Sequence, residues 1–217
     1  MNSPRIKICC IANEKEAADA IAFGASAIGL VGAMPSGPGP ISDDEIFRIA
    51  KRVPPPIATF LLTSQQTSQG IIDHHHRTRT NTIQIVDELP ERDYSAIRDA
   101  LPNVRLVQVI HVIGDESVDE AAELAEHVDA ILLDSGNPNL AVKELGGTGR
   151  RHDWSLSRKI VETCRKPVFL AGGLNADNVR EAIDTVQPFG LDLCSGVRTD
   201  GKLDRRKLEA FFDAVAA

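Results

Sequence analysis

The sequence predicts an α/β protein, a single-domain (β/α)8 TIM barrel that spans residues 1–217. Short β-branched runs alternate with amphipathic segments of helix length along the whole chain, which is the pattern of βα units around a parallel sheet. Eight such units can be counted, and eight parallel strands can close on themselves without leaving an exposed edge. A chain of 217 residues can bury one core, and a barrel of this size is usually one domain.

The strands are predicted where apolar, β-branched runs stop at turn-forming residues. The eight predicted strands are about 5–10, then 25–31, 57–62, 82–86, 105–112, 130–134, 167–171 and 191–195.

Capping residues predict where several helices begin. Asn13 starts a helix over about 13–23, Ser42 with Glu45 forms a capping box for the second helix, and Asp115 starts the helix within 115–128. Asn175 is expected to cap the helix within 176–186, and the last predicted helix covers about 204–215.

Composition excludes several classes of protein. The 24 Lys and Arg residues against 31 Asp and Glu residues give a net charge of −7, which argues against a broad nucleic-acid-binding surface. No apolar run is long enough for a membrane span, and the chain does not start with a secretion signal, so we expect no membrane partner and a cytoplasmic location. The four cysteines are expected to be reduced thiols in a protein without a disulfide framework.

Two glycine-rich segments follow the seventh and eighth strands. "AGGLN" contains Gly172 and Gly173, which let a backbone approach a ligand closely, and "SGVRTDG" begins with Ser195, Gly196 and Val197, whose amides can start a short extra helix. Tight turns alone would explain either segment. Their shared position after strands 7 and 8 predicts the phosphate site of a barrel.

Two side chains that end strands are candidates for acid–base chemistry. Asp134 ends the sixth strand, where burial could raise its pKa and make it a general acid, although a cap or turn would also explain it. Cys9 ends the first strand and is a candidate base or a packing residue. Gly146, Gly147 and Gly149 indicate a mobile segment able to fold over a bound substrate.

Two further patterns suggest metal sites, and neither is expected to form one. Cys9 and Cys10 would alternate between the faces of a strand, so they cannot clamp a metal together. The histidine run at 74–76 lies between the third helix and the fourth strand, on the stabilising face of the barrel, and is expected to be a solvated surface run. We predict neither a metal nor a cofactor.

Seven segments together resemble the phosphoribosylanthranilate isomerase family, whose members carry out an Amadori rearrangement of an aminoaldose to an aminoketose. The resemblance covers nearly the whole chain, and the combination of "GGTG", "DW", "AGGLN" and "SGV" is specific. The segments are "KICCI" at 7–11, "GASAIGLV" at 24–31, "IQIV" at 83–86, "ILLDS" at 131–135, "GGTGRRHDW" at 146–154, "LAGGLNADNV" at 170–179 and "DLCSGV" at 192–197.

The resemblance implies roles for individual residues. Cys9 matches the family's general base and Asp134 its general acid. The resemblance also implies that the phosphate of a small-molecule substrate binds the amides around Gly172, Gly173, Ser195 and Gly196. The resemblance makes Asp192 a further site residue. Gly147, Val197 and Arg198 complete the predicted site, Arg198 because it directly follows the phosphate loop.

The chain departs from the family's pattern at four positions. Gly39 stands where the family has an arginine thought to hold the anthranilate carboxylate, and losing such a contact costs about 1.5–3 kcal/mol. Cys10 stands at a usual glycine, Val86 at a usual histidine, and Arg198 follows "SGV" where the family has glutamate.

Three hypotheses stay open. The chain is a working phosphoribosylanthranilate isomerase in which Arg150, Arg151 or Arg198 replaces the missing arginine, or a divergent paralogue acting on another phosphorylated sugar or aminoaldose, or a non-catalytic barrel that binds a phosphate ligand. The sequence leaves open the oligomeric state, the effect of the altered loop at 33–41, and the roles of Cys10 and of the histidine run.

Overall fold

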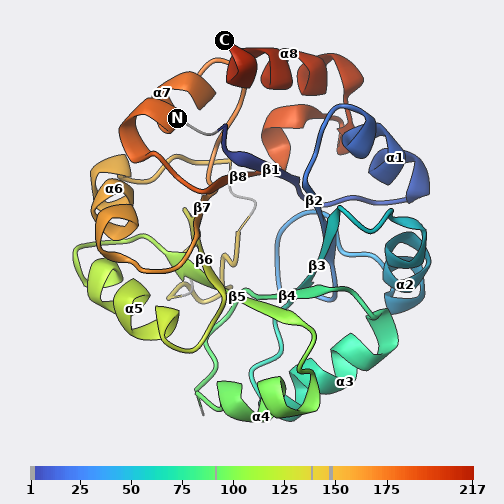
Figure 1. Cartoon of the computed structure of the whole chain (residues 1–217), viewed down its shortest axis with the longest axis vertical. Coiled ribbons are helices and arrows are strands. Elements are labelled where there is room, and N and C mark those ends of the chain that lie inside the picture. The colour runs from blue at the N-terminus through green and yellow to red at the C-terminus, as the bar shows by residue number, and fades with distance from the viewer. Residues whose placement is uncertain (1–2, 91, 138, 147–148) are drawn as a thin grey trace.

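A computed structural model describes residues 3–90, 92–137, 139–146 and 149–217. Within them, eight parallel strands form a closed barrel in sequence order, and helices surround it (Figure 1). The barrel strands are β1 (Arg5–Ile8), β2 (Ala27–Val31), β3 (Ala58–Thr63), β4 (Thr82–Ile85), β5 (Arg105–His111), β6 (Ala130–Asp134), β7 (Val168–Leu170) and β8 (Gly190–Leu193).

The outer layer consists of helices that follow the strands in turn. They are α1 (Glu14–Ala22), α2 (Asp43–Arg52), α3 (Ser68–Thr78), α4 (Tyr94–Ala100), α5 (Glu116–Ala125), α6 (Trp154–Thr163), α7 (Val179–Val186) and α8 (Arg205–Ala216). A 3₁₀ turn, η1 (Ser195–Val197), and a two-stranded ribbon of β9 (Arg198–Thr199) and β10 (Lys202–Leu203) lie between β8 and α8. The (β/α)8 prediction is confirmed.

The buried apolar side chains form two layers. One lies between the strands and the helices and includes Ile8, Ile28 and Leu61. The other fills the inside of the barrel with residues that alternate along the strands with those of the first layer. This inner layer includes Ala27, Val31, Phe60, Leu62, Val107, Val109, Ala130, Leu132 and Phe169. The barrel interior is therefore a packed core and not a channel.

Side-chain capping agrees with the sequence prediction at two helices. Asn13 accepts a hydrogen bond from the amide of Glu16, and Ser42 accepts one from the amide of Glu45. The capping box of α2 is incomplete, because the Glu45 carboxylate contacts Arg48.

Two other predicted caps differ from the structure. Asp115 is the N-cap residue of α5, but its side chain makes no capping hydrogen bond. Asn175 accepts hydrogen bonds from the amides of Asp177 and Asn178, so it organises a turn, and the regular helix begins only at Val179.

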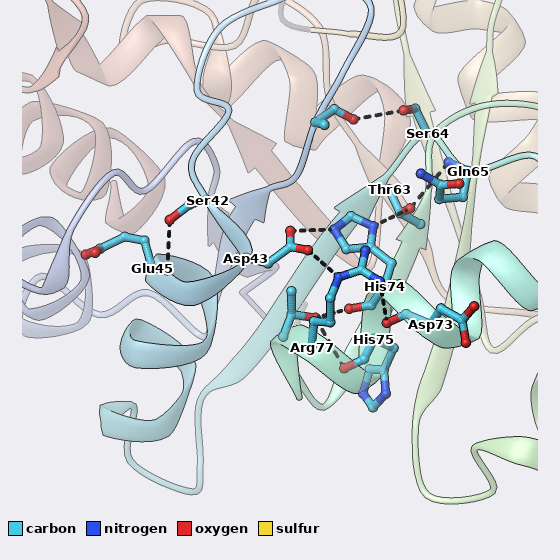
Figure 2. A network of polar contacts seen from close by, with 12 residues as sticks. Ser42, Asp43, Glu45, Thr63, Ser64, Gln65, Asp73, His74, His75 and Arg77 are labelled. Atoms are coloured by element: carbon cyan, nitrogen blue, oxygen red, sulfur yellow. Dashed lines mark hydrogen bonds and ion pairs between the residues drawn. The ribbon is translucent and has the colours of Figure 1, made fainter.

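The histidine run is not the solvated surface run that the sequence predicts. His74 and His75 are buried, and only His76 is exposed. The His74 ring lies within hydrogen-bonding distance of the Thr63 hydroxyl (2.8 Å) and of Asp43 (3.1 Å), as Figure 2 shows. Because Thr63 ends β3 and Asp43 begins α2, His74 lies toward the C-terminal ends of the strands, and the predicted face was wrong. The error arose because α3 extends through the run.

Burial lowers the pKa of both histidines, so they are neutral packing residues at pH 7. The His74 ring fills the space beside Gly32, where a Cβ would lie 2.4 Å from its Cε1. It thereby supports the start of the loop that follows β2.

Within the described residues, no helix is both long and apolar enough to cross a bilayer.

Candidate active site

A pocket opens where the barrel strands end, on the face where (β/α)8 proteins carry their chemistry. Its walls come from the ends of β1, β2, β3, β4, β6, β7 and β8 and from loops that follow them. The described lining residues are Cys9, Cys10, Val31, Met34, Ser36, Gly37, Pro38, Leu62, Gln84, Val86, Asp134, Leu145, Gly146, Gly149, Ala171, Gly172, Gly173, Leu174, Asp192, Leu193, Cys194 and Ser195.

Cys9 lies one residue beyond β1, and its amide donates a hydrogen bond to the carbonyl of Leu193. Its side chain is buried beside Gly29 of β2. A Cβ on Gly29 would lie 2.7 Å from the Cys9 sulfur and 3.2 Å from Cε of Lys7. Gly29 therefore provides the space in which the Cys9 thiol and the Lys7 stem lie together at the floor of the pocket.

Asp134 is the last residue of β6 and is almost fully buried. Burial raises the pKa of its carboxyl group, against the opposing effects of the Ser135 amide and of His111. One carboxylate oxygen accepts the Ser135 amide at 2.7 Å. The other lies against Gly146, where a Cβ would be 2.5 Å away. The loop after β6 thus folds back over a carboxyl group that can hold a proton.

A buried ion pair lies beneath the pocket. The Lys7 ammonium, fully buried on β1, donates to Oδ2 of Asp192 on β8 at 2.8 Å. Desolvation acts against this charge, but Asp192 and the nearby cysteines outweigh it and raise the pKa of Lys7. Oδ1 of Asp192 has no hydrogen-bond partner among the described residues and belongs to a residue that lines the pocket. It is therefore a free acceptor for a ligand hydroxyl or amine.

The glycines after β7 pack against the loop that follows β6. Gly172 and Gly173 both have positive φ angles, 86° and 65°. A Cβ on Gly173 would lie 2.9 Å from the carbonyl oxygen of Gly149 and 3.0 Å from that of Arg150. Only glycine allows this backbone conformation together with so close an approach.

The segment after β8 lies against the loop that follows β7. A Cβ on Gly196 would lie 2.0 Å from the carbonyl oxygen of Leu174, so the two glycine-rich segments are in direct backbone contact. Ser195 lines the pocket. Val197 does not, since its side chain is in the core and its amide donates to the carbonyl of Cys194. The two segments therefore lie side by side, with the Val197 side chain packed beneath them.

The adjacent cysteines do not alternate between the faces of a strand, because β1 ends at Ile8. Cys10 has a φ of 60°, which turns the chain so that both cysteines line the pocket. Its sulfur lies 2.8 Å from that of Cys194 and 3.6 Å from the carbonyl oxygen of Pro38. A Cβ on Gly39 would lie only 2.6 Å from the Cys10 Cβ. Cys10 therefore occupies the space that a side chain at position 39 would need.

None of the three arginines that were candidates to replace the family's arginine lines the pocket. Arg198 is buried, pairs with Glu16 at 3.0 Å and donates to the carbonyls of Cys9 and Cys10. Arg151 pairs with Glu181 and stacks on Trp154, and Arg150 contacts Glu144. Among the described lining residues, none carries a positive charge. In the described structure Arg198 thus supports the Cys9–Cys10 turn from beneath.

Several pocket residues were missed by sequence reasoning. Gln84 on β4 lines the pocket, and its buried Oε1 has no partner in the described structure. Lys7, which lies beneath the pocket, is a charged residue inside an apolar strand, and that signal could have revealed it. Met34, Ser36 and Leu145 come from loops and carry no such signal. Gly147 lies outside the described residues.

No cluster of three or more metal-ligating side chains occurs in the part of the chain that the structure describes.

This fold and pocket define a (β/α)8 barrel enzyme with its acid–base candidates and its glycine-rich loops at one mouth. The family model for N-(5'-phosphoribosyl)anthranilate (PRA) isomerase matches residues 6–214. The chain therefore belongs to the PRA isomerase family.

Curated relatives and solved structures agree. The N-(5'-phosphoribosyl)anthranilate isomerase of Methanosarcina acetivorans is 34% identical, with 97% of this chain and 92% of the relative covered. That of Halobacterium salinarum is 35% identical, with 98% and 96% covered. The crystal structure of phosphoribosyl anthranilate isomerase from Thermotoga maritima is similar with a TM-score of 0.82 at 30% identity, covering 98% of each chain. A structure of the isomerase with reduced 1-(o-carboxyphenylamino)-1-deoxyribulose 5-phosphate has a TM-score of 0.79 at 28% identity, with the same coverage.

Proposed function

We propose that this protein, acting as a single domain, isomerises N-(5-phosphoribosyl)anthranilate to the 1-deoxyribulose phosphate aminoketose. The observation that carries the proposal is the convergence of Cys9, Asp134 and both glycine-rich loops on one pocket. Family membership, with curated relatives of the same name, supports it further.

Asp134 is proposed as the general acid. Burial raises the pKa of Asp134, so its carboxyl group holds a proton more readily than an exposed one does. Such a group can protonate the furanose ring oxygen as the ring opens to a Schiff base. The loop around Gly146, which lies against the carboxylate, limits the access of water to this proton.

Cys9 is proposed as the general base, with its thiolate as the reacting form. It removes the proton from C2' of the Schiff base to give an enolamine, which tautomerises to the ketose. The neighbouring Lys7 ammonium is a fixed positive charge beside the thiolate, and Asp192 keeps that charge in place. Oδ1 of Asp192 is available to accept a substrate hydroxyl group.

The substrate phosphate is proposed to bind the backbone amides at Gly172, Gly173, Ser195 and Gly196. The glycines let the backbone approach the anion closely, and amides at the start of η1 favour negative charge.

We also propose that the enzyme works in the cytoplasm, where its four free cysteines stay reduced.

An anthranilate-fluorescence assay under reducing conditions tests the proposal, with the labile substrate generated in situ. Wild-type protein and Cys164→Ser, which changes a thiol outside the pocket, should turn over equally. Cys9→Ser and Asp134→Asn should lose at least about 10²-fold in kcat, the size of an acid–base contribution. Turnover by both variants at the wild-type rate would remove the assigned roles.

A second candidate function is favoured by the absence of a positively charged side chain among the described lining residues. A carboxylate on the substrate would find no charged partner there, which suits a phosphorylated aminoaldose without a carboxylate. If the wild type is inactive on the anthranilate substrate while a phosphosugar raises its melting temperature, this paralogue hypothesis replaces the first. Stabilisation by phosphate ligands without any turnover would indicate a binding barrel.

A further inference from the structure

Two thiols from opposite ends of the sequence meet in the wall of the pocket. Cys10 belongs to the turn after β1, and Cys194 lies between β8 and η1. Their sulfur atoms are 2.8 Å apart, and both residues line the pocket. The proposed isomerase chemistry uses neither of them, and Cys10 replaces a glycine of the family pattern.

We propose that Cys10 and Cys194 form a redox modification site, at which a hydroperoxide oxidises the two thiols to a disulfide that inactivates the pocket. The Cys194 thiolate first attacks the peroxide O–O bond, which gives a sulfenic acid on Cys194 and releases hydroxide, or an alkoxide from an organic hydroperoxide. The Cys10 sulfur then attacks the Cys194 sulfur, loses its proton, and displaces water as the disulfide forms. Two thiols are thereby oxidised by two electrons, and the peroxide is reduced.

The environment assigns the two roles. Cys194 is partly exposed, whereas Cys10 is buried. The contact with the Cys10 thiol, assisted by the Arg198 guanidinium, lowers the pKa of Cys194. Contact with Cys194 and Cys9, together with burial, raises the pKa of Cys10. The more accessible and more readily ionised sulfur is thus the one that meets the oxidant.

Geometry also favours this pair over the other thiols. A disulfide has an S–S bond of about 2.05 Å, so the Cys10 and Cys194 sulfurs need to approach by only about 0.8 Å. Disulfides usually need Cα atoms about 4.4–6.8 Å apart, but consecutive Cα atoms are only about 3.8 Å apart, which disfavours a bond between Cys9 and Cys10. Cys164 lies at the C-terminal end of α6, toward the opposite face of the barrel.

The disulfide would act on the proposed base through the backbone. Cys10 directly follows Cys9, and its sulfur would leave the carbonyl of Pro38 as it moved toward Cys194. A misplacement of the reacting groups on the order of 1 Å can cost about 10²-fold in rate. We therefore expect oxidation to lower turnover by about 10- to 100-fold. This loss rests on the proposed function, whereas formation of the bond does not.

Peptide mapping of the full chain tests the bond itself. The reduced protein is treated with hydrogen peroxide at low molar excess, remaining thiols are alkylated, and the protein is cleaved with trypsin without reductant. The expected product is peptide 8–15, alkylated once on Cys9, linked to peptide 181–198. Its mass is two hydrogen atoms below the sum of peptide 181–198 and the singly alkylated peptide 8–15, while the Cys164 peptide 160–165 is alkylated. Dithiothreitol should release both linked peptides.

Three variants make the assignment specific, with the activity of each compared only with its own reduced form. Cys10→Gly and Cys194→Ala should form no linked peptide and keep their activity through a peroxide dose that inactivates the wild type reversibly. Cys164→Ser should behave as the wild type does. A peptide 8–15 still linked to 181–198 in Cys10→Gly would assign the bond to Cys9 and overturn the proposal.

Three further outcomes test the redox site and separate it from the proposed function. Absence of the linked peptide from the peroxide-treated wild type would refute the redox site, whatever the activity does. Formation of the linked peptide in a protein without isomerase activity would support the redox site and count against the proposed function instead. Loss of activity that dithiothreitol does not restore would point to over-oxidation of Cys9 and against a protective or regulatory disulfide.

Discussion

Gly39 packs so closely against Cys10 that a side chain at position 39 would overlap it. A Cβ on Gly39 would lie 2.6 Å from the Cys10 Cβ and 3.0 Å from its sulfur, and Gly39 has a φ of 91°. Gly39→Ala should therefore be destabilising for two reasons, steric overlap with Cys10 and backbone strain. Cys10→Gly removes only the first of these.

The two contributions can be separated in size. Overpacking of a well-packed site costs about 1–3 kcal/mol, and a non-glycine residue at positive φ costs about 1–2 kcal/mol. Gly39→Ala should thus lower the free energy of unfolding by about 2–5 kcal/mol in the wild type. In a Cys10→Gly background only the strain remains, together with a contact of 3.1 Å to the Cα of residue 10, so the cost should fall to about 1–2 kcal/mol.

Urea unfolding of the wild type, the two single variants and the double variant measures this difference as a coupling free energy. The expected coupling is about 1–3 kcal/mol, well above the roughly 0.5 kcal/mol within which independent substitutions add. Costs of Gly39→Ala that are equal in both backgrounds would refute the steric argument. As a functional extension, Gly39→Arg in the Cys10→Gly background should bind a carboxylate-bearing ligand about tenfold or more tightly than Cys10→Gly alone.

Three further predictions follow from the buried polar groups and the loop contact. Lys7→Met leaves the Asp192 carboxylate buried without its partner and should lower the free energy of unfolding in urea by about 3–5 kcal/mol. Adding Asp192→Asn should recover part of this loss. No recovery would mean that the broken ion pair is not the cause. Burial lowers the pKa of His152 to about 4, so the unfolded chain binds a proton between pH 6.5 and 4 that the folded one does not. The wild type should therefore lose up to about 3 kcal/mol more stability than His152→Gln as the pH falls through that window, and parallel pH profiles would contradict this. Gly196→Ala places a Cβ 2.0 Å from the carbonyl oxygen of Leu174 and should lower the free energy of unfolding by about 1–3 kcal/mol. It should also weaken the binding of inorganic phosphate, measured by calorimetry. Unchanged values of both quantities would show that the two loops are not in contact.

The sequence alone was sufficient for the barrel and for the positions of Cys9 and Asp134 at its mouth. Alternating β-branched and amphipathic segments reflect local periodicity, which each strand and helix carries in its own residues. Because parallel strands present their C-terminal ends to one face, a residue that ends a strand is placed at that face by its position in the chain. The pairing of the two glycine-rich loops follows from the same rule.

Contacts between distant residues were decided only by the tertiary structure. Whether Arg198 reaches a ligand or supports the Cys9–Cys10 turn depends on Glu16, which lies 182 positions away. His74 is buried because Thr63 and Asp43 both approach it, and a run of histidines carries no sign of that. Cys10 likewise has a positive φ just beyond β1 and packs against Gly39, a contact between distant residues. Periodicity specifies which face of an element is buried, but the partner that each polar side chain meets depends on how the elements close into the barrel.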